Sequence, residues 1–328
     1  MRAVVLRSYG GPEVLTFEDV PDPSPGPDEV VVDVAATALN RADLLQRMGL
    51  YPDPRRLQPE IPGLEFAGTV IERGSRATMW QVGDRVMGIE AGGAYAERIA
   101  THERQLLAVP AGIDLVDAAG IPEVFLTAWD ALVLQGGLTS GRWALVHAGG
   151  SGVGTAAIQI AKAIGARVIT TAKAGDHEFV RSLGADAAID FTSTDYVDAV
   201  AEMTAGSGVD VVFDTIGGDA LTRSPLTLAD FGRVVSIVDI AQPQNLIDAW
   251  GKNAAYHFVF TRQNRGKLDA LTTLVERGLV KPVIGATLPL ARMGEAHELL
   301  ENRRSYALRG KVAVDVAGDT VDIPSRIS

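Results

Sequence analysis

The residues with the clearest chemical potential form a glycine-rich segment in the middle of the chain, at positions 149–154. Glycines let a backbone turn tightly and come close to a pyrophosphate, because no side chain stands in the way. A short apolar run at 143–148 precedes the segment, and a helical pattern at 153–164 follows it. The start of such a helix presents free N–H groups and a positive dipole end to an anion. This order predicts a turn that binds a dinucleotide through Gly149, Gly150, Ser151, Gly152, Val153 and Gly154.

Ser151 departs from the G-x-G-x-x-G pattern, because it occupies the second glycine position. Its hydroxyl can still donate to a phosphate oxygen. A glycine-rich turn in another kind of α/β protein is the alternative interpretation. The lengths of the strand, turn, helix and second strand over 143–171 favour nucleotide binding.

The second strand, 167–171, indicates which nucleotide is bound. An acidic residue near its end would bind the adenosine ribose 2′-hydroxyl and favour NAD. No carboxylate occupies this tip, and Lys173 follows it, so we predict NADPH with Lys173 beside the 2′-phosphate. Two alternatives stay open: Lys173 is a solvated loop charge, or the nearby Asp176 supports NADH instead.

Two kinds of segment surround the glycine-rich turn in this chain of 328 residues, which is long enough for two domains. Residues 1–120 alternate apolar stretches with glycine and proline, which predicts a β-rich domain. Residues 143–260 alternate strand and helix, which predicts a doubly wound parallel sheet. The fold class is therefore α/β. We expect 1–122 and 262–328 to form one domain and 123–261 the other.

The expected elements include short strands and longer helices on both sides of the turn. Among them are strands at 94–99, 233–237 and 311–316, and helices at 40–48, 122–134 and 218–228. The polar tail from Gly318 is expected to be frayed.

Composition and charge exclude several classes of function. A net charge of −11 argues against nucleic-acid binding and against an anionic membrane surface. The chain has no cysteine, which excludes disulfides, thiolate metal sites and a cysteine nucleophile, and its five histidines are scattered. No apolar run reaches the roughly 18 residues of a membrane span, and the N-terminus does not read as a signal peptide. We expect a cytoplasmic protein without a metal site.

Several further short fragments, spread over nearly the whole chain, stand in a specific order and spacing. Besides the glycine turn they lie at 9–15, 40–43, 49–52, 62–68, 83–86, 126–129, 208–214, 231–234 and 310–312. Together they resemble the medium-chain dehydrogenase/reductase superfamily, and within it the zinc-independent quinone oxidoreductase branch that includes zeta-crystallin. The resemblance implies a GroES-like β-rich catalytic domain and a Rossmann cofactor domain.

The resemblance also implies chemistry without zinc. Zinc alcohol dehydrogenases of this superfamily place a cysteine ligand where this chain has Asn40 and a histidine where it has Leu64. They carry a four-cysteine structural lobe, for which 90–97 has no room. Bound NADPH can still deliver hydride to a carbon that is already electrophilic, so a quinone or an α,β-unsaturated carbonyl is the expected small-molecule substrate.

The resemblance assigns roles to individual residues. Tyr51 matches the family's active-site tyrosine and is the expected donor to the substrate, and Asn40 would orient substrate or carboxamide; packing and turn roles are the alternatives. Asp43 and Arg47 are expected to form a local ion-pair network, and Glu65 to be structural. Further cofactor contacts are expected at Thr127, His177, Phe191, Val238, Phe258, Phe260 and Lys311. His177 and Phe191 stand where NADPH-binding relatives often have lysine and tyrosine, and buried or solvated roles remain alternatives for the last three.

Three functions stay open on the sequence. The leading one is an NADPH-dependent reductase of quinones or enones. The second is an enoyl-thioester reductase, for which Arg262, Arg265 and Lys267 offer cations to a phosphopantetheine arm. The third is a nucleotide-binding protein with little turnover, such as a redox sensor or a structural protein. The resemblance also implies a homodimer, formed by edge pairing of the nucleotide-domain sheets near 236–260.

Overall fold

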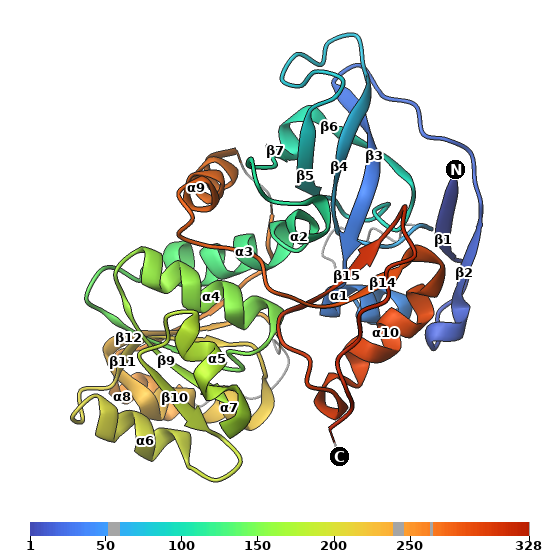
Figure 1. Ribbon diagram of the computed structural model, residues 1–328. Coiled ribbons are helices and arrows are strands. Elements are labelled where there is room, and N and C mark those ends of the chain that lie inside the picture. Colours follow the sequence, from blue (N-terminus) through green and yellow to red (C-terminus); the bar gives the residue numbers. More distant parts are fainter. Residues whose placement is uncertain (52–59, 239–245, 263–264, 328) are drawn as a thin grey trace. The chain divides into compact units, whose positions relative to one another are not determined.

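The computed structural model describes residues 1–51, 60–238, 246–262 and 265–327. The chain divides into two compact units. Unit 1 comprises Met1–Glu123, Gln263–Glu276 and Pro282–Ser328, and unit 2 comprises Val124–Arg262 and Arg277–Lys281. The chain therefore crosses between the units four times, at 123/124, 262/263, 276/277 and 281/282. Figure 1 shows the blue start and the red end of the chain together in unit 1.

Unit 1 is built on one long strand, β3 (Glu29–Ala38), whose apolar residues are buried along most of its length. Its sheet has the order β14-β15-β3-β4-β5-β7, and β6 also pairs with β3. The other strands are β4 (Glu65–Arg73), β5 (Arg85–Ile89), β6 (Arg98–His102), β7 (Leu106–Ala108), β14 (Ile284–Pro289) and β15 (Lys311–Asp315). Strands β1 (Arg2–Leu6) and β2 (Leu15–Asp19) form a separate antiparallel pair. Segments from both ends of the chain therefore hold β3.

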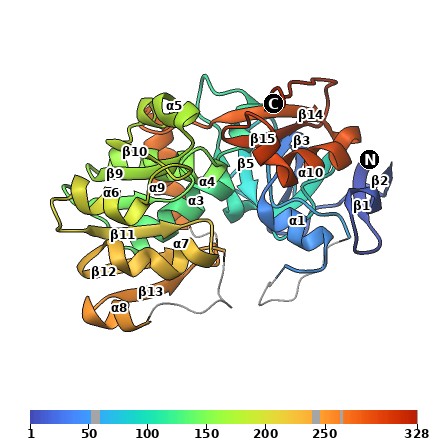
Figure 2. The same cartoon turned by 90° about the horizontal axis from the view of Figure 1, so that it is seen from below.

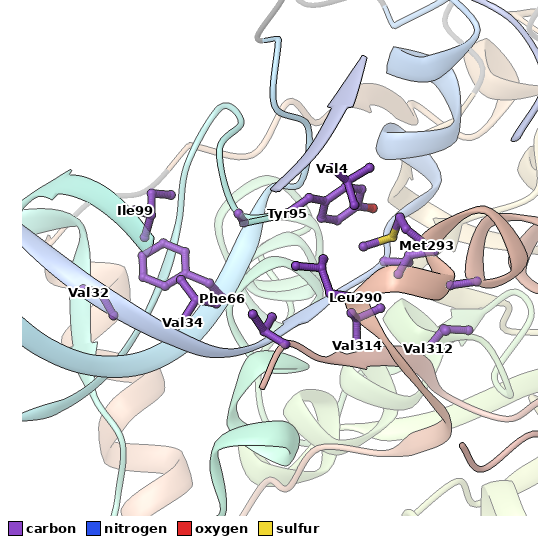
Figure 3. Close-up of a cluster of buried hydrophobic side chains, with 14 of the residues drawn as sticks. Val4, Val32, Val34, Phe66, Tyr95, Ile99, Leu290, Met293, Val312 and Val314 are labelled. Carbon is purple, nitrogen blue, oxygen red and sulfur yellow. The ribbon is translucent and has the colours of Figure 1, made fainter. Parts of the chain in front are cut away.

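Helix α10 (Met293–Glu301) closes the core of unit 1. Its Met293, Ala296 and Leu299 are buried at helical spacing and join one apolar cluster with residues of β3, β4 and β15. Figure 3 shows this cluster, with the Tyr95 ring between Val4 and Met293. Unit 1 also contains α1 (Arg41–Arg47), α2 (Leu115–Ala119) and α9 (Arg265–Glu276).

Unit 2 contains a six-stranded sheet in which every pairing is parallel, in the order β10-β9-β8-β11-β12-β13. Read along the chain, this is the 3-2-1-4-5-6 order of a Rossmann fold. Its strands are β8 (Trp143–Val146), β9 (Arg167–Ala172), β10 (Ala187–Asp190), β11 (Val209–Asp214), β12 (Leu228–Ser236) and β13 (Ala255–Phe258). The predicted α/β fold class, with a β-rich unit and a doubly wound parallel sheet, is confirmed.

Helices lie on both faces of this sheet, as Figure 2 shows. They are α3 (Pro122–Trp129), α4 (Gly152–Ala163), α5 (His177–Ser182), α6 (Tyr196–Met203), α7 (Gly218–Arg223) and α8 (Leu246–Gly251). Buried Leu145, Ile169 and Val212, on three neighbouring strands, form the centre of the core of unit 2. In a parallel order such as this one, ligands bind at the carboxyl ends of the strands, where the strand order reverses between β8 and β11.

Several expected elements differ from the structure. The strand expected at 94–99 begins only at Arg98, because Ala94 and Tyr95 bond to the backbone at 62–63 and β1 instead. The helix expected at 218–228 ends as an α-helix at Arg223, two residues before Pro225, which has no N–H to continue it. The helix expected at 122–134 is α-helical only to Trp129 and then widens to a π-helix over Asp130–Gln135.

Two further predictions, of the start of β12 and of a frayed C-terminal tail, are wrong. Strand β12 starts at Leu228, five residues earlier than predicted, because Leu228 pairs with Val209 before an irregularity that contains Phe231. The tail is not frayed: Thr287 and Asp322 exchange two backbone hydrogen bonds of 2.8 Å, and Ile327 N–H donates to Ser305. The sequence interpretation did not include β7, β13, β14 or α8.

Candidate functional site

The glycine turn of unit 2 connects the carboxyl end of β8 to α4. Ala148 enters it with a φ of 53°, in the left-handed region, and the Ser151 side chain begins α4 by accepting a hydrogen bond of 3.0 Å from Gly154 N–H. The Ser151 oxygen is therefore used as an acceptor, which leaves its O–H hydrogen to donate. The helix that starts here has 12 residues.

Different glycines of the turn serve different purposes. A Cβ at Gly149 would lie 2.2 Å from Thr170 Oγ1, and one at Gly154 would lie 2.2 Å from the Ala148 carbonyl oxygen, so both positions are needed for packing. At Gly150 the nearest atom to an added Cβ would be Asp176 Oδ2, 3.7 Å away. Packing inside the fold therefore does not require a glycine at position 150, which fits a role in the close approach of a pyrophosphate.

The end of β9 brings the residues of the nucleotide prediction together. Lys173 follows the strand and is half-buried, and Asp176 lies beside Gly150 of the turn. His177 begins α5, and its Nε2 lies 3.3 Å from the Ala172 carbonyl oxygen, so the ring is tied to the strand end. Phe191 follows β10 with 52% of its surface exposed. Both a cation and a carboxylate therefore stand near the turn.

A buried polar network supports the same strand ends. His147 Nδ1 lies 3.3 Å from Thr171 Oγ1, which also accepts a hydrogen bond of 3.0 Å from Ala148 N–H. Burial lowers the pKa of His147 to about 4, although Asp214 opposes this shift, so the ring is neutral at pH 7. The sequence interpretation did not include His147 and Thr171 in the site. His147 directly follows β8 and Thr171 is the second-last residue of β9, and these places at the strand ends are the signal that could have found them.

The remaining residues predicted in unit 2 lie on later elements. Thr127 Oγ1 is 2.8 Å from Thr261 Oγ1, so either hydroxyl can donate to the other. Val238 N–H lies 3.3 Å from Ser236 Oγ, whose hydroxyl donates to the buried Asp214 carboxylate at 2.7 Å. Phe258 ends β13 and is 40% exposed, so it is not a buried strand residue. Phe260 has the Arg262 guanidinium over its ring, 5.9 Å from the centroid.

Unit 1 brings Asn40 and Lys311 together, although they are far apart in the sequence. Lys311 Nζ donates to Asn40 Oδ1 at 2.5 Å and to Glu65 Oε1 at 2.6 Å. Asn40 Nδ2 donates to the same Glu65 oxygen at 2.9 Å. Lys311 is 4% exposed and Glu65 is fully buried, so the alternative of a solvated lysine is wrong. The lysine is the counter-ion of a buried carboxylate and fixes the orientation of the Asn40 side chain.

Glu65 also holds the first turn of α3. Its second oxygen, Oε2, accepts a hydrogen bond of 2.8 Å from Glu123 N–H. A carboxylate at this position satisfies a backbone donor that the helix itself cannot satisfy. The structural role expected for Glu65 is therefore visible in its contacts, and it is a direct partner of both Asn40 and Lys311.

Arg47 takes part in an ion pair, as expected, but its partner is Glu301 of α10, and no ion pair of Asp43 occurs among the described residues. Arg47 Nη2 donates to Glu301 Oε1 at 2.5 Å, and within the part of the chain that the structure describes, Arg47 Nε and Nη1 and Asp43 Oδ1 have no hydrogen-bond partner. Asp43 Oδ2 accepts a bond of 2.7 Å from Asn40 N–H. Beside them, Tyr95 Oη lies 3.2 Å from His297 Nε2.

Tyr51 lies just after the loop that follows α1 and is half-buried. The segment that follows it, 52–59, is outside the described residues. The structure therefore brings the sequence-predicted residues into two groups: Asn40 and Lys311 in unit 1, and the glycine turn with Lys173 and His177 in unit 2.

Comparison with known proteins assigns the chain to a family. Residues 26–111 match the family described as alcohol dehydrogenase GroES-like domain, and residues 183–314 match the family described as zinc-binding dehydrogenase. The chain is 33% identical to a quinone oxidoreductase of Pseudomonas aeruginosa, over 93% of this chain and 97% of that protein. It belongs to the medium-chain dehydrogenase/reductase superfamily. Within the superfamily it belongs to the branch of the quinone oxidoreductases, as the sequence predicted.

Other members differ in the reaction that their names give. The chain is 33% identical to the chloroplastic NADPH-dependent alkenal/one oxidoreductase of Arabidopsis thaliana, over 96% of this chain and 79% of that protein. A solved structure of an NAD-dependent alcohol dehydrogenase is 34% identical, with a TM-score of 0.89 and coverage of 97% of this chain and 100% of that chain. The CurK enoyl reductase structure is 28% identical, with a TM-score of 0.86 and coverage of 96% and 98%.

Membership in the superfamily makes the chain an NAD(P)-dependent oxidoreductase of a small molecule. Although one matched family is named for zinc, this chain contains no cysteine. Among the described residues, no three histidine, aspartate or glutamate side chains are grouped so that they could hold a metal ion. No helix in those residues is both long and apolar enough to cross a membrane.

Proposed function

We propose that this oxidoreductase uses NADPH to reduce a quinone or an α,β-unsaturated carbonyl. The observation that carries the proposal is the turn between β8 and α4, where packing does not require a glycine at position 150 and the Ser151 hydroxyl keeps a hydrogen to donate at the start of a helix. The names of the quinone oxidoreductase and alkenal/one oxidoreductase relatives support this class of acceptor.

The chain's own residues would bind and orient the reactants. Bound NADPH supplies a hydride to an electrophilic carbon, and negative charge then develops on the substrate oxygen. The turn N–H groups and the Ser151 hydroxyl would hold the pyrophosphate, and Thr127, Val238, Phe258 and Phe260 would contact the nicotinamide half. The Tyr51 hydroxyl would donate to the substrate oxygen, and Asn40, fixed by Lys311 and Glu65, would orient substrate or carboxamide.

The preference for NADPH would come from the end of β9. Lys173 offers a cation to the 2′-phosphate, whereas Asp176, next to Gly150, would repel that group and bind a ribose hydroxyl instead. We expect Lys173→Ala to raise the Kd for NADPH about tenfold, as for the loss of one charge-assisted hydrogen bond, and to leave the Kd for NADH unchanged. Asp176→Asn should shift the ratio toward NADPH. Fluorescence titration of both nucleotides measures these values.

Arg181→Ala is a matched control, because it removes an exposed cation from α5 of the same unit. Equal loss of NADPH and NADH affinity in Lys173→Ala would contradict the role of the 2′-phosphate. A wild-type preference for NADH would overturn the NADPH proposal and assign the ribose to Asp176.

The acceptor is tested by following oxidation of NADPH with 1,4-benzoquinone, 9,10-phenanthrenequinone and crotonyl-CoA. Turnover with a quinone, reduced in Tyr51→Phe, supports the proposal. Turnover only with the thioester supports an enoyl-thioester reductase, which the likeness to the CurK enoyl reductase keeps as the second candidate. Binding of NADPH without turnover of any acceptor would favour a nucleotide sensor.

We further propose that the protein forms a homodimer through the β13 edge of unit 2. In the described residues β13 pairs on one side only, with β12. Beside it, α8 exposes Ile247 to 81% and Trp250 to 82%, a surface that suits burial against a second copy. Sedimentation of wild type and Ile247→Glu tests this: a monomeric wild type, or a dimer that the charge leaves intact, would contradict it.

A further inference from the structure

Asp43 is a fully buried carboxyl group at the start of α1, directly behind Asn40. Its Oδ2 accepts the 2.7 Å hydrogen bond from the Asn40 backbone N–H. Its other oxygen, Oδ1, has no hydrogen-bond partner within the described part of the chain. A buried carboxylate usually gathers several donors, because burial strongly disfavours an unpaired charge. Asp43 is therefore poised between a charged and a neutral form.

The two cations nearest to Asp43 already have other carboxylates as partners. Lys311 on β15 already donates to the Glu65 carboxylate on β4, and Arg47 on α1 is paired with Glu301 on α10. Tyr95, which precedes β6, faces Asp43 with its hydroxyl, which as a donor lowers the pKa of Asp43, and the same hydroxyl contacts the neutral His297 of α10. When Asp43 ionises, a second carboxylate competes with Glu65 for the field of Lys311.

Asn40 is the point at which these two carboxyl groups meet. Its backbone N–H donates to Asp43, and its side chain is hydrogen-bonded to Lys311 and Glu65. We propose that Asp43 is a positioning residue whose charge state sets how firmly Asn40 is held, so that reduction responds to pH through this buried carboxyl group. This inference rests on the proposed function of Asn40 in the reductase.

The expected direction follows from hydrogen-bond strength. An N–H bonded to a carboxylate is held about twice as strongly as one bonded to a neutral acceptor. Ionised Asp43 should therefore fix Asn40 and favour the reaction, and protonated Asp43 should loosen it. Burial raises the pKa of Asp43 to about 7, partly offset by the Asn40 N–H and by Lys311, which puts the change in the neutral range.

Asp43→Asn is the informative variant, because it keeps an acceptor oxygen for the Asn40 N–H and removes the titration. Measured with NADPH and 1,4-benzoquinone, the ratio of wild-type to variant kcat/KM should rise about three- to tenfold with pH, with a midpoint near 7. The ratio removes any pH dependence of the chemistry that both proteins share. Asp114→Asn is the control, because Asp114 also accepts a backbone N–H at a helix start, that of α2, but is exposed. Its ratio to wild type should stay constant with pH.

A second measurement reports on Asn40 without any turnover. Leu39–Asn40 is the only Leu–Asn pair in the sequence, so labelling with carbonyl-13C leucine and 15N asparagine isolates the Asn40 amide in an NMR spectrum. Its resonance should titrate near pH 7 in the wild type and stay constant in Asp43→Asn. The same labelling isolates the Asn40 amide in Asp43→Asn, because position 43 follows Ala42 and the substitution creates no second Leu–Asn pair.

The possible results test the link between Asp43 and Asn40 separately from the proposed function. A titrating amide with a rising activity ratio of the same midpoint supports the proposal. An amide that does not titrate overturns it, and a titrating amide with a flat ratio overturns the link to the reaction. Absence of turnover with every acceptor overturns the proposed function itself, together with its pH response. The pH titration of the Asn40 amide resonance still shows in that case whether Asp43 holds Asn40.

Discussion

The buried pair of Lys311 and Glu65 should be far more costly to break than a pair at the surface. Lys311 is 4% exposed, Glu65 is fully buried, and their charged atoms are 2.6 Å apart. Lys311→Met keeps much of the side-chain volume but leaves the Glu65 carboxylate uncompensated and Asn40 Oδ1 without its donor. We expect a loss of about 3–5 kcal/mol in the free energy of unfolding of unit 1.

The double variant Lys311→Met/Glu65→Gln distinguishes a lost attraction from an unpaired charge. Because it removes both charges, it should be clearly more stable than Lys311→Met alone, although Glu65 also holds the start of α3. Arg7→Met is the matched control in the same unit: its pair with Glu60 is also 2.6 Å long, but both side chains are 61% exposed. That substitution should cost less than about 1 kcal/mol.

The assay must report on unit 1, since a chain with two units need not unfold in one step. Of the four tryptophans, Trp80 lies in the core of unit 1, where its indole N–H donates to the Glu103 carbonyl at 2.7 Å. Urea titration followed by 19F NMR of 5-fluorotryptophan at position 80 therefore measures this unit. A loss in Lys311→Met no larger than that in Arg7→Met would refute the reasoning.

Three further predictions concern separate places in the two units. Gly154→Ala should lower the melting temperature, because its Cβ would press on a carbonyl oxygen, whereas Gly150→Ala should melt like the wild type yet lose affinity for NADPH by calorimetry. The pKa of His297 is lowered by burial to about 3, so the unfolded chain binds a proton below pH 6.5 that the folded chain refuses. Stability should fall by about 1.4 kcal/mol per pH unit from 6.5 downward, and this slope should be absent in His297→Gln in urea titrations. Phe231 has a φ of 63° and is 76% exposed, so Phe231→Gly should raise the free energy of unfolding by about 1 kcal/mol, while Phe231→Ala, which keeps the Cβ, should not.

The doubly wound unit was predictable because its signals are local. Glycines 149–154 lie between an apolar strand and an apolar helix, and each piece carries its own periodicity. Strand β13 escaped prediction because Ala255–Phe258 is short and lies at the edge of the sheet, where its side chains are only partly buried. Strand β14 escaped because Gly285 and Pro289 are weak strand formers.

The polar cluster of unit 1 could not be worked out in the same way. The resemblance indicated Asn40, Glu65 and Lys311 one at a time, but their contacts depend on where β3, β4 and β15 meet. The ion-pair network expected around Asp43 and Arg47 left their partners unnamed, because those partners come from elements distant in the sequence. In this buried helix Arg47 reaches Glu301 of α10, a residue that no local pattern links to it.

The contact between Lys311 and Asn40 spans 271 residues of sequence, which has a consequence for how the chain is made. During synthesis from the N-terminus, β3 and β4 emerge long before β15, so Glu65 has no cation and the β3 edge has no β15 partner. Unit 2, whose strands end at Phe258, is complete while unit 1 still waits for its last strands. A ribosome stalled before Lys311 should therefore carry a folded nucleotide unit and an exposed, unfinished β-sheet, which is the form that chaperones would meet.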